Sequence, residues 1–175
     1  MKKFKGFTLV EVLVIMFIIT TLSTVLVVNW RKNEKRYQLQ RSAQEVVQSL
    51  RKAQNMALAG KDTCDQEPSC TIPPNYGVYF GKTTLTSYVI FADKNNNGKY
   101  GGGESAEAVE LIDLGTGTEF MLSADLDIVF SVPDGFILIN GSPRPTEASL
   151  IIKQSGLIRN FKIIKIKKSG QITIQ

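Results

Sequence analysis

Histidine is absent from the 175-residue chain, and cysteine and tryptophan are scarce, with two residues and one residue respectively. Without histidine the chain has no Ser-His or Cys-His catalytic pair, no histidine-ligated zinc and no imidazole that titrates near neutral pH. Two cysteines are too few to build a disulfide-based fold. The sequence offers no other catalytic constellation, so we predict no enzymatic activity and no required cofactor.

The net charge of +5 is distributed unevenly along the chain. Residues 61–147 hold five basic and thirteen acidic residues, whereas residues 148–175 hold six basic residues and no acidic one. The chain is therefore segregated in charge rather than broadly basic. Binding to nucleic acid or to an anionic membrane does not follow from the net charge alone.

A long apolar run occupies residues 7–28, and Glu11 is its only charged residue. At about 1.5 Å per residue, a helix of this length spans the roughly 30 Å of a bilayer's hydrocarbon. The run is longer than the apolar region of a cleaved secretory signal, and no small-x-small cleavage site follows it. These features predict a retained transmembrane helix. Basic residues flank the run on both sides, so the charge rule does not set its orientation.

The start of the run, Lys5-Gly6-Phe7-Thr8-Leu9-Val10-Glu11, resembles the prepilin signal of type IV pilins and of type II secretion pseudopilins. The resemblance implies that a prepilin peptidase cleaves between Gly6 and Phe7 and that Phe7 is then N-methylated. It also implies an inner-membrane protein with a cytoplasmic N-terminus and an external head. Residues 7–28 lack the proline common in major pilins, which favours a minor pilin or pseudopilin.

Glu11 is predicted to be an assembly residue. A carboxylate within a membrane helix is costly and usually has a partner. Cleavage after Gly6 would place a new ammonium group at Phe7, in the same low-dielectric layer as Glu11, where an ion pair is stronger than in water. A pair formed between subunits would fix the axial step of a helical assembly, so homologous pilin subunits are the expected partners.

The apolar run is predicted to continue into a helical stem over residues 29–60. Apolar residues recur there at spacings of three or four, which is typical of one buried helix face. The stripe comprises Leu39, Ala43, Val46, Val47, Leu50, Ala53 and Ala57. Gly60 is a plausible C-terminal stop. The alternative for this stripe is a dimeric coiled coil.

Residues 61–175 are predicted to form a β-rich head. Short β-branched and aromatic runs alternate there with turn residues. The expected strands cover residues 76–80, 87–92, 108–114, 126–131, 136–139, 149–153, 157–167 and 171–174. The predicted fold class is therefore α+β: residues 1–6 form a leader, and a long helix packs on a mostly antiparallel head. This arrangement resembles GspH/FimT-type pseudopilins and minor pilins, which implies a structural subunit of a pilus or secretion pseudopilus.

A calcium motif follows one predicted strand. Asp93, Asn95, Asn97, Lys99 and Glu104 satisfy the spacing D-x-[DN]-x-[DN]-G-x5-E, in which Lys99 contributes its carbonyl. Two charged ligands predict weak affinity, with a dissociation constant of about 10⁻⁴ to 10⁻³ M. The flanking strands are unlike the helices of an EF-hand. A Gly/Asn-rich hairpin without an ion is the alternative.

Two further features concern the head. Cys64 and Cys70 flank a turn-forming Pro-Ser pair, and an oxidising exterior favours a local disulfide over free thiols.

The C-terminal segment carries a basic set, which comprises Arg159, Lys162, Lys165, Lys167 and Lys168. Alternation with isoleucine predicts that Lys165 and Lys167 share one face of a strand. This set would contact DNA in a FimT-like minor pilin, whereas pairing with the acidic block or protection of a strand edge is the alternative that we favour.

Overall fold

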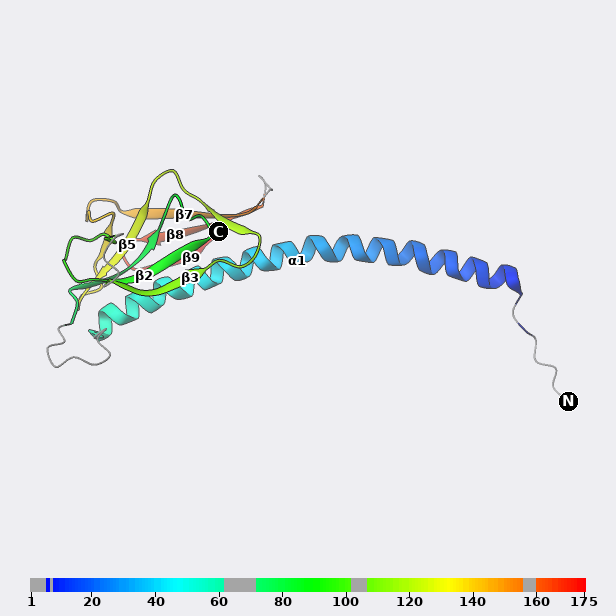
Figure 1. Ribbon diagram of the computed structural model, residues 1–175, viewed down its shortest axis with the longest axis horizontal. Helices are drawn as coiled ribbons and strands as arrows, with labels where there is room; N and C mark the ends of the chain where they lie inside the picture. Colours follow the sequence, from blue (N-terminus) through cyan, green and yellow to red (C-terminus); the bar gives the residue numbers. More distant parts are fainter. Residues whose placement is uncertain (1–5, 7, 62–71, 102–106, 156–159) are drawn as a thin grey trace. The chain divides into compact units, whose positions relative to one another are not determined.

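The computed structural model describes residues 6, 8–61, 72–101, 107–155 and 160–175, without the side chains of residues 25–33. The chain divides into two compact units, Met1–Tyr37 and Gln38–Gln175. Helix α1 (Leu9–Ala59) begins in the first unit and ends in the second. In the described part of the chain it is followed by nine strands, labelled in Figure 1 where space allows. The prediction of one helix of about 50 residues is confirmed, since α1 has 51.

Local hydrogen bonds define both ends of α1. At the start, the Glu11 amide donates to the Thr8 hydroxyl at 3.3 Å, so Thr8 is the N-cap residue. At the end, the amides of Gly60 and Lys61 donate to the carbonyls of Ala57 and Met56 at 3.2 and 3.1 Å. Gly60 has a φ of 55°, and this combination is the Schellman motif. The predicted stop at Gly60 is confirmed.

The second unit contains two antiparallel sheets. Sheet A has the order β3 (Ala108–Asp113), β2 (Ser87–Asp93), β1 (Asn75–Phe80), β5 (Leu126–Ser131) and β6 (Ile137–Ile139). Sheet B has the order β4 (Thr118–Met121), β7 (Glu147–Gln154), β8 (Phe161–Lys167) and β9 (Ile172–Ile174). The α+β class and the antiparallel head are thus confirmed, and β4 is a strand that the sequence pattern missed.

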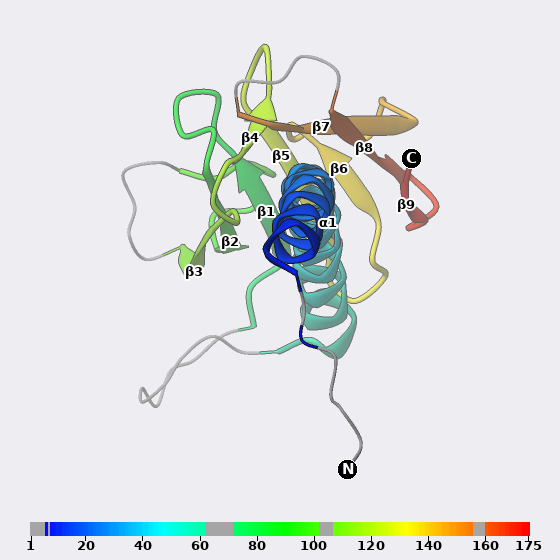
Figure 2. The same ribbon diagram turned by 90° about the vertical axis from the view of Figure 1, so that its right-hand side faces the viewer.

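One core joins the two sheets to the stem half of α1. All seven residues of the predicted stripe are buried, with exposed fractions of 7% or less. They pack in one cluster with residues of both sheets, such as Ile90 and Ile128 of sheet A and Leu150 and Ile164 of sheet B. Figure 2 shows the sheets wrapped around this part of the helix. The stripe is therefore a docking face for the head within one chain, as predicted.

Two hydroxyl pairs lie within this apolar contact. Ser42 Oγ and Thr118 Oγ1 are 3.1 Å apart, and Ser49 Oγ and Tyr88 Oη are 2.9 Å apart. Burial raises the pKa of the Tyr88 phenol, so the group stays protonated and available as a donor. Because all four residues are buried, each pair satisfies polar groups that water does not reach.

Replacement of Ser49 by alanine is expected to destabilise the head. The Tyr88 hydroxyl would lose its partner while it stays buried, which costs about 1 to 3 kcal/mol of unfolding free energy. Because Ser49→Ala/Tyr88→Phe removes both polar groups, the double variant should recover part of that loss. Denaturant unfolding of the three proteins measures the effect. A double variant less stable than Ser49→Ala would contradict the assigned hydroxyl pair.

Candidate functional site

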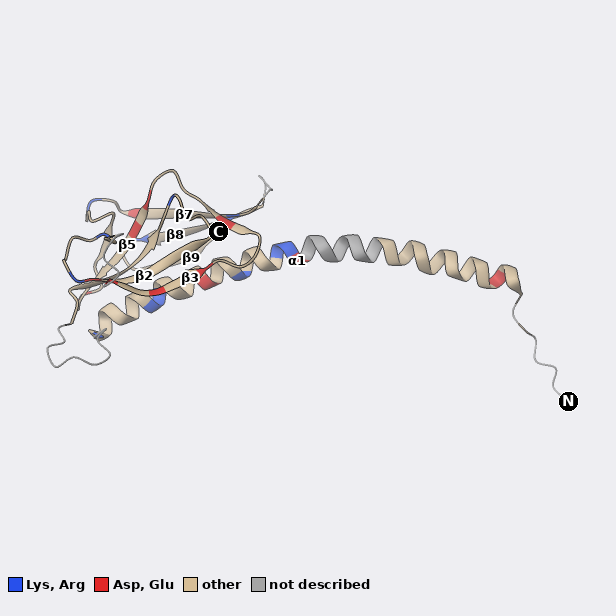
Figure 3. Ribbon diagram, viewed as in Figure 1, with Lys and Arg blue, Asp and Glu red and all other residues tan. Residues whose placement is uncertain are grey.

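The first unit exposes an apolar helix. The large hydrophobic residues from Leu9 to Leu22 have exposed fractions between 42% and 80%. They point in all directions around α1, and the described part of this segment has Glu11 as its only charge, as Figure 3 shows. A helix that is apolar on every side needs an apolar environment. This surface is the candidate functional site.

The polar residues of this segment bond within the helix. The hydroxyls of Thr20 and Ser23 each donate to the carbonyl four residues earlier at 2.7 Å. Thr21 and Thr24 donate to the carbonyls of Ile18 and Thr20, in both cases at 2.9 Å. Such internal bonds satisfy the hydroxyl protons, so these residues present mainly carbon to the surroundings. The whole segment therefore offers an apolar surface despite four hydroxyl groups.

Glu11 lies in the first turn of α1, at the third helical position after the Thr8 cap. Thr8 and Glu11 have the spacing of a capping box, a signal in the sequence that our prediction did not use. A carboxylate at this position also interacts favourably with the helix dipole. Within the described residues its side chain has no hydrogen bond or ion pair. Glu11 is exposed and available to a partner from outside the chain.

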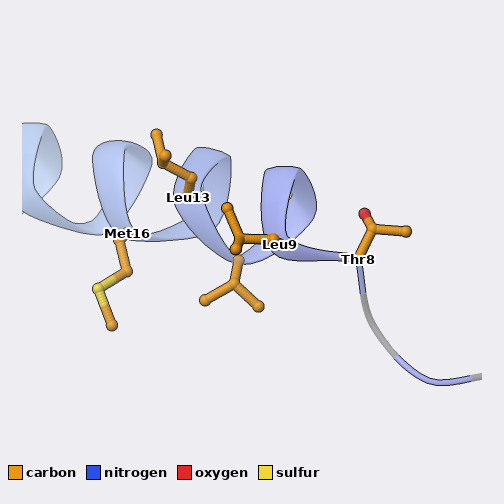
Figure 4. A pocket seen from close by; sticks show the side chains of 5 residues that line it. Thr8, Leu9, Leu13 and Met16 are labelled. Atoms are coloured by element: carbon orange, nitrogen blue, oxygen red, sulfur yellow. The ribbon is translucent and has the colours of Figure 1, made fainter.

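A small apolar hollow lies on the helix surface near the start of α1. Its lining residues follow a helical spacing and belong to a single face, seen from close by in Figure 4. They are Thr8, Leu9, Val12, Leu13 and Met16. The hollow accepts a side chain from a second helix more readily than a polar ligand, because four of its five lining residues are apolar.

The other features predicted at the N-terminus have separate outcomes. Gly6 is exposed, with no atom near the place where a Cβ would stand, while Phe7 lies outside the described residues. Of the helical segments that the structure describes, none combines the length and the apolar character needed to cross a membrane. The transmembrane span over residues 7–28 stays a prediction.

The predicted calcium loop connects β2 to β3. Asp93 is fully buried and accepts hydrogen bonds from Asn75 Nδ2 at 2.8 Å and from the amides of Gly98 and Asn97 at 2.9 and 3.1 Å. Asn95 and Asn97 accept from amides within the loop at 3.0 and 2.8 Å. These contacts show a structural role for each of the three side chains. Calcium binding stays a prediction.

The loop gives no independent indication of a cation. Glu104 lies outside the described residues, so the motif's second carboxylate has no described position. Among the described residues, no three acidic or sulfur side chains are placed to hold a metal ion. The motif's remaining oxygens from Asp93, Asn95 and Asn97 already stabilise the loop.

Two buried carboxylates beside this loop were missed by the sequence analysis. Asp127 Oδ1 accepts from the Tyr100 amide at 3.0 Å, and Glu107 Oε2 accepts from the Gly101 amide at 3.1 Å. Glu107 is 1% exposed, and its Oε1 has no hydrogen-bond partner in the described part of the chain. Burial raises the pKa of Asp127, and this effect exceeds the opposing effects of the Tyr100 amide and Lys99. No local motif marks either residue, because their burial depends on contacts between segments that are distant in the sequence.

The basic C-terminal set is divided by the fold. Lys165 and Lys167 lie on the outer face of sheet B, whereas Ile164 and Ile166 are buried, so the predicted alternation is confirmed. Lys162 has the parity of the buried isoleucines and therefore points to the opposite face. Lys168 Nζ donates to the Pro143 carbonyl at 3.0 Å. Arg159, like the predicted disulfide pair Cys64 and Cys70, lies outside the described residues.

The comparisons with known proteins agree with both parts of this description. Residues 1–27 match the family model described as the prokaryotic N-terminal methylation motif. The chain has a pilin-like fold. A crystal structure of the Pseudomonas aeruginosa PAO1 type IV minor pilin FimU matches with 18% identity and a TM-score of 0.53, over 80% of this chain and 90% of FimU. A second crystal form of FimU matches with 18% identity and a TM-score of 0.50, over 78% and 92% of the two chains.

At this identity the FimU match establishes the fold of the chain and nothing more. No curated protein that was compared with the sequence matches it. The methylation motif covers the leader and much of the exposed apolar segment, whereas the FimU match covers most of the chain. The two findings together confirm the predicted combination of a prepilin-type start and a pilin-type head.

Asp127 predicts a pH dependence of head stability. Its pKa is higher in the folded protein than the ordinary 3.8, so the folded state binds the proton more tightly than the unfolded chain. Stability contributed by this group is therefore lost as the pH rises through the interval between the two pKa values. Asp127→Asn removes the charge and keeps an oxygen for the Tyr100 amide. It should raise the melting temperature at pH 7 and raise it less at pH 4.

Asp134→Asn is the matched control, since Asp134 lies on an exposed turn. Thermal unfolding at both pH values measures the difference between each variant and the parent. An equal effect of Asp127→Asn at pH 7 and pH 4 would show that the buried charge is not the cause.

Proposed function

We propose that the protein is a minor pilin or pseudopilin, a structural subunit that assembles through its N-terminal helix into a type IV pilus or a secretion pseudopilus. The observation that carries this proposal is the exposed apolar surface of residues 9–22, which is too large to remain in water. A bilayer covers this surface before assembly, and helices of neighbouring subunits cover it afterwards. The methylation motif at residues 1–27 supports the same conclusion.

The proposed function involves two forms of the subunit, a membrane-bound precursor and a processed form. The precursor is held in the inner membrane by the apolar helix, with its N-terminus in the cytoplasm and its head outside. A prepilin peptidase then cleaves after Gly6, which creates an ammonium group on Phe7. Removal of Lys2, Lys3 and Lys5 leaves a segment whose one fixed charge pair is the Phe7 ammonium and the Glu11 carboxylate.

The pair explains why a carboxylate is tolerated in an apolar segment. Glu11 is exposed and has no partner within the described residues. An incoming subunit would bring its own Phe7 ammonium to this carboxylate. Removal of one partner from such a desolvated pair costs about 3 to 5 kcal/mol.

Processing at the Gly6–Phe7 bond is the first expectation. The mature chain should begin with N-methyl-Phe7, because the leader matches the methylation motif. N-terminal mass analysis of protein from a strain with a prepilin peptidase tests this directly. An intact Met1 or a cleavage at another bond would contradict it.

Glu11→Ala is expected to leave membrane association intact and to reduce incorporation into filaments at least tenfold, since about 1.4 kcal/mol already corresponds to a factor of ten. Quantitative immunoblots of membrane and sheared-filament fractions measure the two quantities. Glu34→Ala is the matched control, because Glu34 is an exposed residue of the same helix beyond the apolar run. Equal filament recovery for Glu11→Ala and the parent would contradict the proposed role.

A further inference from the structure

The outer face of sheet B carries an apolar row. Met121 of β4 pairs with Ile151 of β7, and Ile151 pairs with Ile163 of β8, so the three side chains stand side by side on one face. Phe161 lies on the same face two residues from Ile163. Met121 and Phe161 are 45% and 48% exposed. The set of Met121, Ile151, Ile163 and Phe161 is called the sheet B row below. It lies on the solvent side of sheet B, since the opposite face of the sheet packs on the core.

Charged residues border the row on both sides. Lys153 and Glu119 form an ion pair at 3.0 Å on one side. On the other side the pairs are Ser149 with Lys165 and Glu147 with Lys167. An apolar centre within a mixed polar rim is typical of protein interfaces. Nucleic-acid interfaces are more polar and more strongly positive, and Glu119 and Glu147 would repel phosphates here.

A second exposed apolar patch lies on β3, at the edge of sheet A. In the described residues β3 pairs only with β2, and Val109 and Leu111 are 40% and 67% exposed. Leu111 and Asp113 pair with Val89 and Ser87, so they share the sheet face that points away from the stem. This set of Val109, Leu111 and Asp113 is called the β3 edge below. The β3 edge therefore combines exposed apolar side chains with the exposed carboxylate of Asp113.

The two patches lie on opposite flanks of the head, as Figure 2 shows for β3 and for β7 with β8. They are complementary, because each has exposed hydrocarbon while one carries Lys165 and Lys167 and the other Asp113. A contact between two different patches of the same chain is heterologous, and its repetition builds an open helix when the rotation between copies does not close a ring. A pilus-type filament requires this kind of contact.

We propose that the sheet B row of one subunit docks on the β3 edge of a second copy of this chain. The inference rests on the proposed assembly function and adds a head contact to the helix contact. Met121, Ile163 and Phe161 cover Val109 and Leu111, while Lys165 and Lys167 approach Asp113. The tail lysines are then partners of the acidic block rather than ligands of DNA.

Charge reversal in the full-length, processed protein tests the contact. Lys165→Glu/Lys167→Glu and Asp113→Lys should each reduce recovery in sheared filaments roughly tenfold, which corresponds to about 1.4 kcal/mol per contact. The triple variant that combines them carries both reversed patches on every subunit, so its recovery should return to within about twofold of the parent. Such rescue is specific to opposite charges that meet.

Matched control variants separate the effect of the proposed contact from a general effect of the charge change. Lys82→Glu/Lys94→Glu makes the same charge change at exposed loop lysines, and Asp134→Lys does so at an exposed turn. Both controls should assemble like the parent. Thermal unfolding confirms that each variant folds, and Lys165→Gln/Lys167→Gln replaces the reversal if the glutamates unfold the head. The glutamine pair should reduce recovery about threefold.

Three results would overturn the proposal. The first is filament recovery of Lys165→Glu/Lys167→Glu at the level of the parent while Glu11→Ala is impaired. This result would agree with the proposed helix contact and refute the head contact alone. The second is failure of the triple variant to regain assembly, which would mean that the lysines meet another group. The third is loss of salt-dependent DNA retention with unchanged filament recovery, which would assign the lysines to DNA. Failure of the parent itself to enter filaments would instead refute the proposed function.

Discussion

The hydrocarbon exposed by residues 9–22 is the constraint on which the rest of this structure depends. These side chains surround α1 completely, and the four hydroxyls of Thr20, Thr21, Ser23 and Thr24 bond to the helix itself. Such a surface has no stable state in water as a monomer. A helix that is apolar on every side is typical of a membrane or of a helix bundle, where a carboxylate usually has a partner.

The stem half of the same helix satisfies a different requirement. From Leu39 to Ala57 a single stripe is buried against two sheets, and exposed charges such as Arg41 and Glu45 pair on the other side of the helix. Apolar contacts supply most of the attraction, while the Ser49–Tyr88 and Ser42–Thr118 pairs limit how the helix is placed within the core. One continuous helix thus exposes apolar side chains over residues 9–22 and buries an apolar stripe against the head over residues 39–57.

Much of the fold was predictable because its signals are local. The position of the helix was predictable from an apolar run, from apolar residues spaced three or four apart and from Gly60. The turn at Asn140-Gly141 has positive φ at both residues, which is typical of an Asn-Gly pair. Strand β4 was missed because four residues between polar turns carry little pattern. Its place depends on pairing with β7, which lies 30 residues later in the chain.

The site was predictable only in part, for the same reason. Glu11 stood out because a charge in an apolar run is rare, and the prepilin-type junction is a contiguous motif. The burial of Glu107 and Asp127, the separation of Lys162 from Lys165, and the alignment of Met121, Ile151 and Ile163 depend on strand register and loop path. Contacts between distant segments leave no local signature. The calcium motif shows the converse, since Asp93 matches a ligand pattern and also has a structural role of its own.

The central claim is that the Phe7 ammonium of one subunit meets the Glu11 carboxylate of another. Zero-length carbodiimide cross-linking of filaments made from an equal mixture of isotopically light and heavy subunits measures this contact directly, with mass spectrometry of the joined peptides. The account predicts an amide bond between Phe7 and Glu11, with half of the joined peptides containing one light and one heavy partner. An N-methylated amine still has one hydrogen to lose in that reaction. Joined peptides of a single isotope only, or none in filaments of processed protein, would contradict the account.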